Sequence, residues 1–208
     1  ERYVGQVAVY QIWDEPNLQA AWGANADPGG YLRLLEASSN AIRRADPSAT
    51  ILLAGLAPTV ERGPANLSDL DYLAALYQAG GAAFFDGVSG KPYGFDTDPT
   101  DRTVDPYMLN FSRLIAMREV MVANGGENQL VWASHSGWNS LPADWAGAPS
   151  VWGAVDPAGQ AERSIAAIDR AQREWPWLAV LVLERDDGHG LNEDDPRRGV
   201  SVGGQPKR

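Results

Sequence analysis

The feature that most constrains the fold of this chain is a series of five short apolar runs separated by longer stretches. Each run is nearly continuous in apolar residues instead of alternating, which is typical of strands that are buried on both faces. We therefore predict five strands, at residues 7–13, 51–57, 87–93, 130–136 and 178–184.

The stretches between these runs have the apolar spacing of amphipathic helices. They predict helices at residues 31–45, 70–79, 107–123 and 160–175. An aspartate followed by a proline suits the start of a helix, and such pairs occur at Asp27-Pro28, Asp105-Pro106 and Asp156-Pro157. Ser68 with Asp71 resembles a capping box, and Gly80 and Gly125 suit helix ends.

The predicted elements alternate as β-α-β-α-β-α-β-α-β, which indicates a parallel sheet covered by helices. With 208 residues and no low-complexity linker, the chain suits a single domain that spans residues 1–208. The segment 186–208 is polar, with glycines and acidic residues, so we expect it to be mostly loop.

Composition and charge argue against several classes of function. A net charge of −10 argues against a nucleic-acid partner, whose phosphates require a basic face, and fits a neutral ligand such as a sugar. No apolar run is long enough to cross a bilayer, so no membrane span is expected. The absence of cysteine excludes disulfides and thiolate nucleophiles but leaves the cellular compartment open. Nothing in the sequence requires a cofactor.

Polar residues follow each apolar run at the same end. They are Asp14 and Glu15, Thr59, Lys91, Ser134 with His135, and Glu184. In parallel α/β folds the ligand site lies at the carboxyl ends of the strands. A strand that reaches the surface explains any one of these residues, but polar residues at all five ends favour a shared site. We expect Glu15, Lys91, His135 and Glu184 to converge on one face.

Motifs along the chain resemble, in order, those of the clan A retaining glycoside hydrolases. The segment 10–17, YQIWDEPN, resembles the strand-4 motif, usually WNEPN. Segments 55–59, 85–94, 131–138 and 175–178 resemble the regions of strands 5, 6, 7 and 8. The similarity is greatest to cellulase- and β-xylosidase-like members. It implies a (β/α)8 TIM barrel, of which this chain supplies the C-terminal five-strand portion.

The resemblance assigns roles to individual positions. Glu15 matches the general acid/base, and retaining glycosidases need a second carboxylate about 5–5.5 Å away as nucleophile. His135 occupies the position of that nucleophile. Asp14 replaces an asparagine that binds the sugar, Lys91 replaces a histidine, and Glu184 stands near the usual place of a tryptophan. Changes confined to the site suggest that it was repurposed, by nature or by engineering.

The catalytic candidates are therefore Glu15, His135 and Lys91. Contacts with substrate are expected from Trp13, Asp14, Asn17, Tyr93, Trp138 and Glu184. Lys91 suits Schiff-base or proton-transfer chemistry if desolvated, or else pairs with nearby acids. His135 suits a general base, or else fills the vacated space. A metal site of His135, Glu15 and Glu184 lacks the usual histidine spacing, and none is expected.

Three functions stay open at this point. The chain is a glycoside hydrolase domain that acts on O-glycosidic bonds of a β-linked saccharide, or a derivative with the nucleophile replaced by His135. Alternatively, it is a non-hydrolytic carbohydrate-binding pseudoenzyme, with Trp13, Tyr93 and Trp138 as stacking surfaces. The third possibility is a re-engineered catalyst on this scaffold that uses Lys91, His135 or Glu184 for proton transfer or carbonyl chemistry on another small-molecule ligand. An open sheet exposes apolar edges, so we expect a homo-oligomer or part of a longer chain.

Overall fold

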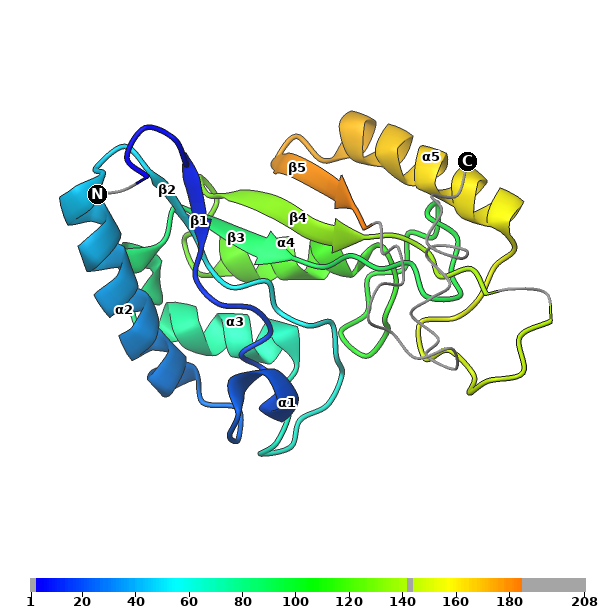
Figure 1. Cartoon of the computed structure of the whole chain (residues 1–208), viewed down its shortest axis with the longest axis horizontal. Helices are drawn as coiled ribbons and strands as arrows, with labels where there is room; N and C mark the ends of the chain where they lie inside the picture. The colour runs from blue at the N-terminus through cyan, green and yellow to red at the C-terminus, as the bar shows by residue number, and fades with distance from the viewer. Residues whose placement is uncertain (1–2, 142–143, 185–208) are drawn as a thin grey trace.

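The computed structural model describes residues 3–141 and 144–184, and its centre is a curled parallel sheet (Figure 1). The five strands lie in the order of the chain, β1-β2-β3-β4-β5, and every neighbouring pair is parallel. The strands are β1 Val9–Gln11, β2 Thr50–Leu52, β3 Gly87–Gly90, β4 Leu130–Ser136 and β5 Leu178–Leu183. The predicted parallel sheet is confirmed, although β1, β2 and β3 are shorter than the apolar runs that contain them.

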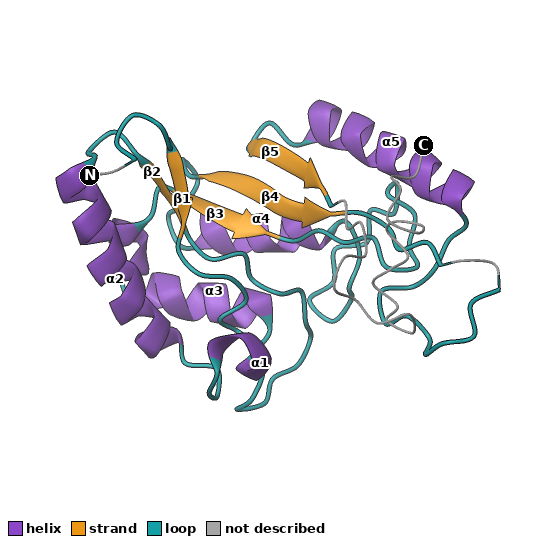
Figure 2. Ribbon diagram, viewed as in Figure 1, coloured by secondary structure: helices purple, strands orange, loops and turns teal. Residues whose placement is uncertain are grey.

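Helices connect the strands and cover the sheet (Figure 2). The four long ones are α2 Pro28–Ala45, α3 Asp69–Gln78, α4 Arg113–Ala123 and α5 Pro157–Glu174. Helices α2, α3 and α4 pack in a row, and α5 lies beside β5. Two short elements were not predicted, the single-turn helix α1 Gln19–Trp22 and the 3-10 helix η1 Gly81–Phe84.

The ends of these helices follow from local chemistry at most predicted positions. Asp27 accepts a hydrogen bond from the Gly30 amide at 2.9 Å, and Asp156 caps α5 in the same way, each just before a proline in the first turn. Gly80 and Gly125 adopt φ angles of 79° and 81°, the left-handed conformation that ends a helix and that glycine adopts without steric cost.

One predicted helix start and one predicted helix cap are wrong. The helix expected from residue 107 begins at Arg113, because Asp105 instead closes a turn by accepting a hydrogen bond from the Tyr107 amide at 2.7 Å. Ser68 precedes α3 but makes no side-chain cap, so the capping box with Asp71 does not form. The Ser68 hydroxyl is buried and lies 3.5 Å from the Arg113 guanidinium.

A buried ion pair joins the neighbouring helices α3 and α4. The side chains of Arg113 and Asp69 are only 3% and 2% exposed and lie 2.6 Å apart at their closest atoms. Arg113 also donates to the carbonyls of Thr59, Pro106 and Met108. One side chain therefore links two helices to the loops that precede them.

The lengths of the connections distinguish the two ends of the sheet. The loops that follow the carboxyl ends of β2, β3 and β4 are long and span residues 53–68, 91–112 and 137–156. The connections at the other end, such as 46–49 and 124–129, are short. In folds of this kind the long loops at the carboxyl ends build the ligand site. This end of the sheet is where a site is expected.

Candidate functional site

A lysine and two carboxylates meet at the carboxyl end of the sheet. The Nζ atom of Lys91, just after β3, lies 2.8 Å from Asp14 Oδ2 and 2.7 Å from Glu15 Oε1, both just after β1. The Lys91 side chain is 3% exposed, whereas those of Asp14 and Glu15 are 50% and 31% exposed. The ammonium is therefore buried beneath two carboxylates that face solvent. We call these three residues the Lys91 triad.

The backbone that carries the two carboxylates has an unusual conformation. Trp13 and Glu15 have φ angles of 72° and 51°, in the left-handed region that residues other than glycine rarely adopt. The Glu15 amide donates to the Gly55 carbonyl at 2.9 Å, and Asp14 forms a β-bridge with Gly55. Residues held in this way cluster at functional sites, where the surrounding structure offsets their conformational cost.

Gly55 is the residue around which the site is assembled. A Cβ atom at this position would lie 2.9 Å from Asp14 Oδ1, 3.1 Å from Lys91 Cε and 3.1 Å from Ser134 Oγ. Groups that follow β1, β2 and β3 therefore meet Ser134 of β4 at one point. No larger residue than glycine fits there without displacing them.

His135 follows Ser134 in β4 and so lies at the edge of this cluster. Its Nδ1 atom is 3.2 Å from Ser134 Oγ, and its side chain is partly buried. A neutral imidazole here either accepts a hydrogen bond from the hydroxyl or donates one to it, depending on its tautomer. Strand β4 thus contributes an imidazole and a hydroxyl to the site.

Tyr93 and Glu184 form a second polar pair at the same end. The Tyr93 hydroxyl donates to Glu184 Oε2 at 2.5 Å, which joins the segment after β3 to the end of β5. Burial raises the pKa of Tyr93 well above its usual range, and the hydrogen bond to Glu184 and the negative charges of Glu184, Glu15 and Asp14 raise it further. The carboxylates of the Lys91 triad therefore act electrostatically on the Tyr93 hydroxyl.

Two predicted substrate contacts point into the protein. Asn17 is 0% exposed. Its carboxamide nitrogen donates to the carbonyls of Ala57 and Leu67, at 2.9 and 3.0 Å, and its oxygen accepts a hydrogen bond from the Ala57 amide. Trp138 is 3% exposed and donates from its indole nitrogen to the Thr97 carbonyl at 2.7 Å. Both side chains fix loops that surround the site.

Trp13, in contrast, lies at the surface. It is 49% exposed and packs edge-to-face on Trp22 of α1, with ring centroids 5.8 Å apart. Its neighbour in the chain is Asp14 of the Lys91 triad. An aromatic face at this rim is available to a ligand that approaches the triad.

Sequence reasoning missed Gly55 and Gln11. Gln11, the last residue of β1, donates from Nε2 to Asp14 Oδ1 at 3.3 Å and to the Trp13 carbonyl at 3.1 Å. A glycine within an apolar run is a known signal of close backbone approach, so Gly55 could have been found. Gln11 shows no comparable signal, because its role depends on how the chain turns after β1.

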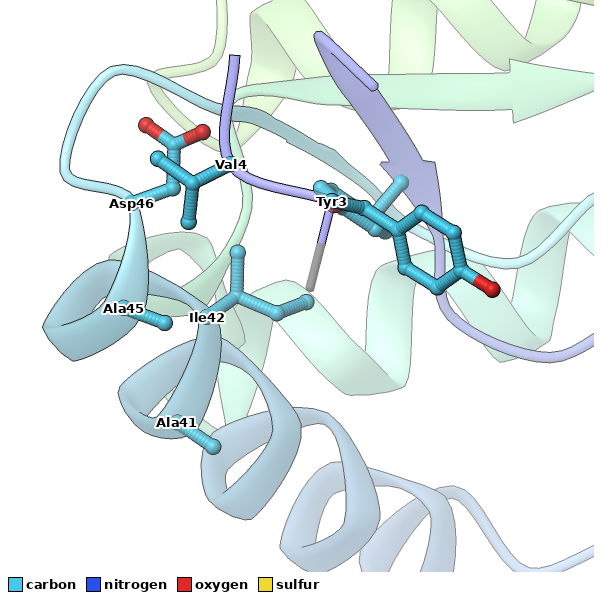
Figure 3. Close-up of a pocket in the computed structure, with 7 residues that line it drawn as sticks. Tyr3, Val4, Ala41, Ile42, Ala45 and Asp46 are labelled. Carbon is cyan, nitrogen blue, oxygen red and sulfur yellow. The ribbon is translucent and has the colours of Figure 1, made fainter. Parts of the chain in front are cut away.

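A separate pocket of about 280 Å³ lies at the opposite end of the sheet (Figure 3). It is formed between the segment before β1 and the last turns of α2, and Figure 3 labels Val4, Ile42 and Ala45 among its residues. Its lining is mainly apolar, and no residue of the Lys91 triad takes part in it. In barrel folds this end of the sheet serves stability.

Within the described ranges, no helix is long and apolar enough to cross a membrane. Among the same residues, no three histidine or acidic side chains are placed to hold a metal ion.

Comparison with known proteins identifies the fold. No family model and no curated protein matches the sequence. A glucosidase from Croceicoccus marinus aligns with 93% of this chain at a TM-score of 0.64 and 16% sequence identity. Cel44A, a family 44 endoglucanase from Clostridium thermocellum, aligns with 85% of it at a TM-score of 0.52 and 14% identity.

The fold is part of a glycosidase-type TIM barrel. The five parallel strands and their helices form a half-barrel that matches these glycoside hydrolases. The chain spans 36% of the length of the glucosidase and 42% of that of the endoglucanase. The likeness is one of fold, at low sequence identity, so the activity must be argued from the residues of this chain.

Proposed function

We propose that this chain is a carbohydrate-binding derivative of a clan A glycoside hydrolase, corresponding to strands 4 to 8 of the barrel, which has lost retaining hydrolysis. The observation that carries the proposal is the Lys91 triad. The carboxylate at the acid/base position, Glu15, is held 2.7 Å from a buried ammonium, and the nucleophile position holds an imidazole.

Retaining hydrolysis needs two carboxyl groups about 5–5.5 Å apart, one to protonate the leaving oxygen and one to attack the anomeric carbon. His135, at the second position, offers a neutral or positive group where the oxocarbenium-like transition state requires a negative one. In this proposal Asp14 is not the nucleophile but a partner of Lys91, because its carboxylate binds the same ammonium as Glu15. The mechanism therefore lacks its covalent step.

Carbonyl chemistry at Lys91 is the less supported alternative. A lysine that forms a Schiff base must attack as a neutral amine. Here the Nζ atom donates to both Asp14 and Glu15, so it is engaged in the triad and not free to attack a carbonyl group.

Binding is supported by the groups around the triad. Trp13 offers an exposed aromatic face for a sugar ring, and Asp14 and Glu184 offer carboxylate oxygens to its hydroxyl groups. Asn17 and Trp138 act as positioning residues, since they hold loops through bonds to backbone carbonyls. Such a mixture of one apolar face and a few oriented polar groups is typical of ligand sites.

Titration calorimetry with cellobiose and xylobiose tests binding directly. We expect the unmodified chain to bind at least one of them, and Trp13→Ala to weaken that binding about tenfold. Tyr3→Ala, an exposed aromatic at the other end of the sheet, is the control and should bind as the unmodified chain does. If neither disaccharide binds, the proposal fails.

Hydrolysis of activated aryl β-glucosides and β-xylosides tests the lost activity. We expect no turnover by the unmodified chain, and we expect His135→Glu to gain some, because it restores the second carboxylate. Turnover by the unmodified chain that is abolished in Glu15→Gln would show that the site is a working hydrolase. Trapping of a Lys91 adduct by borohydride would instead favour carbonyl chemistry.

A further inference from the structure

Tyr107 is the most exposed aromatic side chain on the loop that joins β3 to α4. It is 66% exposed, yet its position is fixed by Arg62, which comes from the loop between β2 and α3. Arg62 donates to the Tyr107 hydroxyl at 2.8 Å, and its guanidinium carbon lies 4.8 Å from the centroid of the ring. Arg62 is held in turn by Asp71 at 2.7 Å.

Arg62 belongs to a small hairpin at residues 61–67, which we call the finger. Arg62 and Leu67 form an antiparallel bridge, and the Gly63 amide donates to the Asn66 carbonyl at 3.0 Å. The Asn66 side chain donates to Glu61 at 3.0 Å and so closes the finger from the side. These bonds give an exposed loop a defined shape.

The base of the finger is fastened to the chain that carries Glu15. Asn17, two residues after Glu15, donates to the Leu67 carbonyl at 3.0 Å, and the Leu67 amide donates back to the Asn17 carbonyl at 2.9 Å. The Gln19 amide also donates to Asn66 Oδ1 at 3.0 Å. The finger is therefore fastened to the segment that follows Glu15 of the Lys91 triad.

The loop that carries Tyr107 is anchored by Arg113 at the start of α4. Arg113 donates to the carbonyls of Pro106 and Met108, on either side of Tyr107, and to the carbonyl of Thr59, which precedes the finger. Since Arg113 is buried against Asp69, this anchor is rigid. Tyr107 is thus anchored through its backbone neighbours and through Arg62, although its side chain is 66% exposed.

We propose that Tyr107 is a stacking platform for a sugar ring remote from Glu15, and that Arg62 is its positioning residue. This inference rests on the proposed function and deepens it. Arg62 packs against one side of the Tyr107 ring, and the exposure of the ring leaves another side to a ligand. An aromatic side chain that is already immobilised loses little conformational entropy on binding, which strengthens its contribution.

The platform implies a ligand longer than a disaccharide. Tyr107 and Glu15 are linked through the finger, which contacts Tyr107 through Arg62 and the segment after Glu15 through Asn17. In this proposal Tyr107 therefore receives a sugar ring other than the one bound at the Lys91 triad. The chain should therefore prefer oligomers or polymers of a β-linked sugar to short fragments of the same sugar.

Calorimetric titration with cellobiose and cellohexaose tests this in the full chain. We expect cellohexaose to bind more tightly than cellobiose. Tyr107→Ala should weaken cellohexaose binding about tenfold and leave cellobiose binding unchanged, whereas Tyr107→Phe, which keeps the ring, should bind nearly as the unmodified chain does. Arg62→Met should weaken cellohexaose binding by a smaller factor, because the ring stays but is no longer held.

The failure of this inference can be told from the failure of the proposed function. If Trp13→Ala weakens the binding of both ligands but Tyr107→Ala leaves cellohexaose binding unchanged, the platform is disproved and carbohydrate binding stands. If the unmodified chain binds neither ligand, both fail. A thermal unfolding midpoint of Tyr107→Ala close to that of the unmodified chain checks that the variant is folded.

Discussion

Lys91 and Glu15 form an ion pair of 2.7 Å in which the cation is buried and the carboxylate is partly exposed. The same ammonium binds Asp14 at 2.8 Å. A buried lysine has lost its hydration, and these two carboxylates replace it. The triad is therefore both the centre of the candidate site and a structural element that joins the ends of β1 and β3.

We predict that Lys91→Met lowers the free energy of unfolding by about 1–2 kcal/mol, because it leaves two neighbouring carboxylates without their shared donor. The loss is limited since both carboxylates reach solvent, which screens their charge. Urea unfolding at neutral pH measures the change. Arg33→Met is the control: Arg33 is 76% exposed, its pair with Asp27 is 3.8 Å long, and its loss should have little effect. Equal stability of both variants would contradict a structural role for the triad.

Gly94 allows Trp138 to pack where it does. A Cβ atom at residue 94 would lie only 1.8 Å from the Trp138 indole, which is too close for any side chain. We predict that Gly94→Ala displaces the indole and lowers the free energy of unfolding by about 3 kcal/mol, a large value for overpacking. Thermal or urea unfolding provides the measurement. In Gly63→Ala the nearest atom lies 3.9 Å away, so that variant should be close to the unmodified chain.

Glu174 connects α5 to the loop after β3 and provides a pH-dependent contribution to stability. Hydrogen bonds from Arg102 and Arg170, with their positive charges, lower the pKa of Glu174 from 4.5 to about 2. A carboxyl whose pKa is lower in the folded state stabilises it fully above pH 4.5 and loses this effect as the pH falls towards 2. We predict that Glu174→Gln flattens this part of the stability profile, as measured by urea unfolding at several pH values. An unchanged slope would show that the arginines do not act on Glu174.

The order of the elements was predictable because it depends on patterns within each segment. The apolar runs identified five parallel strands, and capping aspartates located the starts of α2 and α5. The start of α4 was not predictable in this way. Asp105-Pro106 has the local form of a helix start, but Arg113 binds the carbonyls of Pro106 and Met108 and so favours a turn. That contact depends on the tertiary structure.

The candidate site was likewise predictable only where it depends on local sequence patterns. Strand ends predicted that Lys91 and Glu15 would share a face, because parallel strands end together. Position along a strand does not reveal what a side chain touches. Asn17 and Trp138 stand in the expected motifs, yet both bind backbone carbonyls inside the protein. The sequence therefore predicted which side chains meet at this end of the sheet, but not what each of the others contacts.

The edges of the sheet lead to the last prediction. Among the residues that the structure describes, β1 pairs only with β2 and β5 pairs only with β4. Val182 and Leu183 of β5 are 44% and 40% exposed. Unpaired strands with exposed apolar side chains favour association, since burial of apolar surface contributes roughly 25 cal/mol per Å².

We predict that the 208-residue chain, produced by itself, associates in solution as its concentration rises, and that Val182→Lys reduces this association because a charge on an edge strand opposes pairing. Light scattering coupled to size-exclusion chromatography measures the mass. Val151→Lys is the matched control: Val151 is 75% exposed in the loop between β4 and α5, outside both edge strands, and the change should not alter the result. A single species of 22.4 kDa at every concentration would show that the exposed edges do not pair. Equal association of the two lysine variants would place the contact elsewhere on the surface.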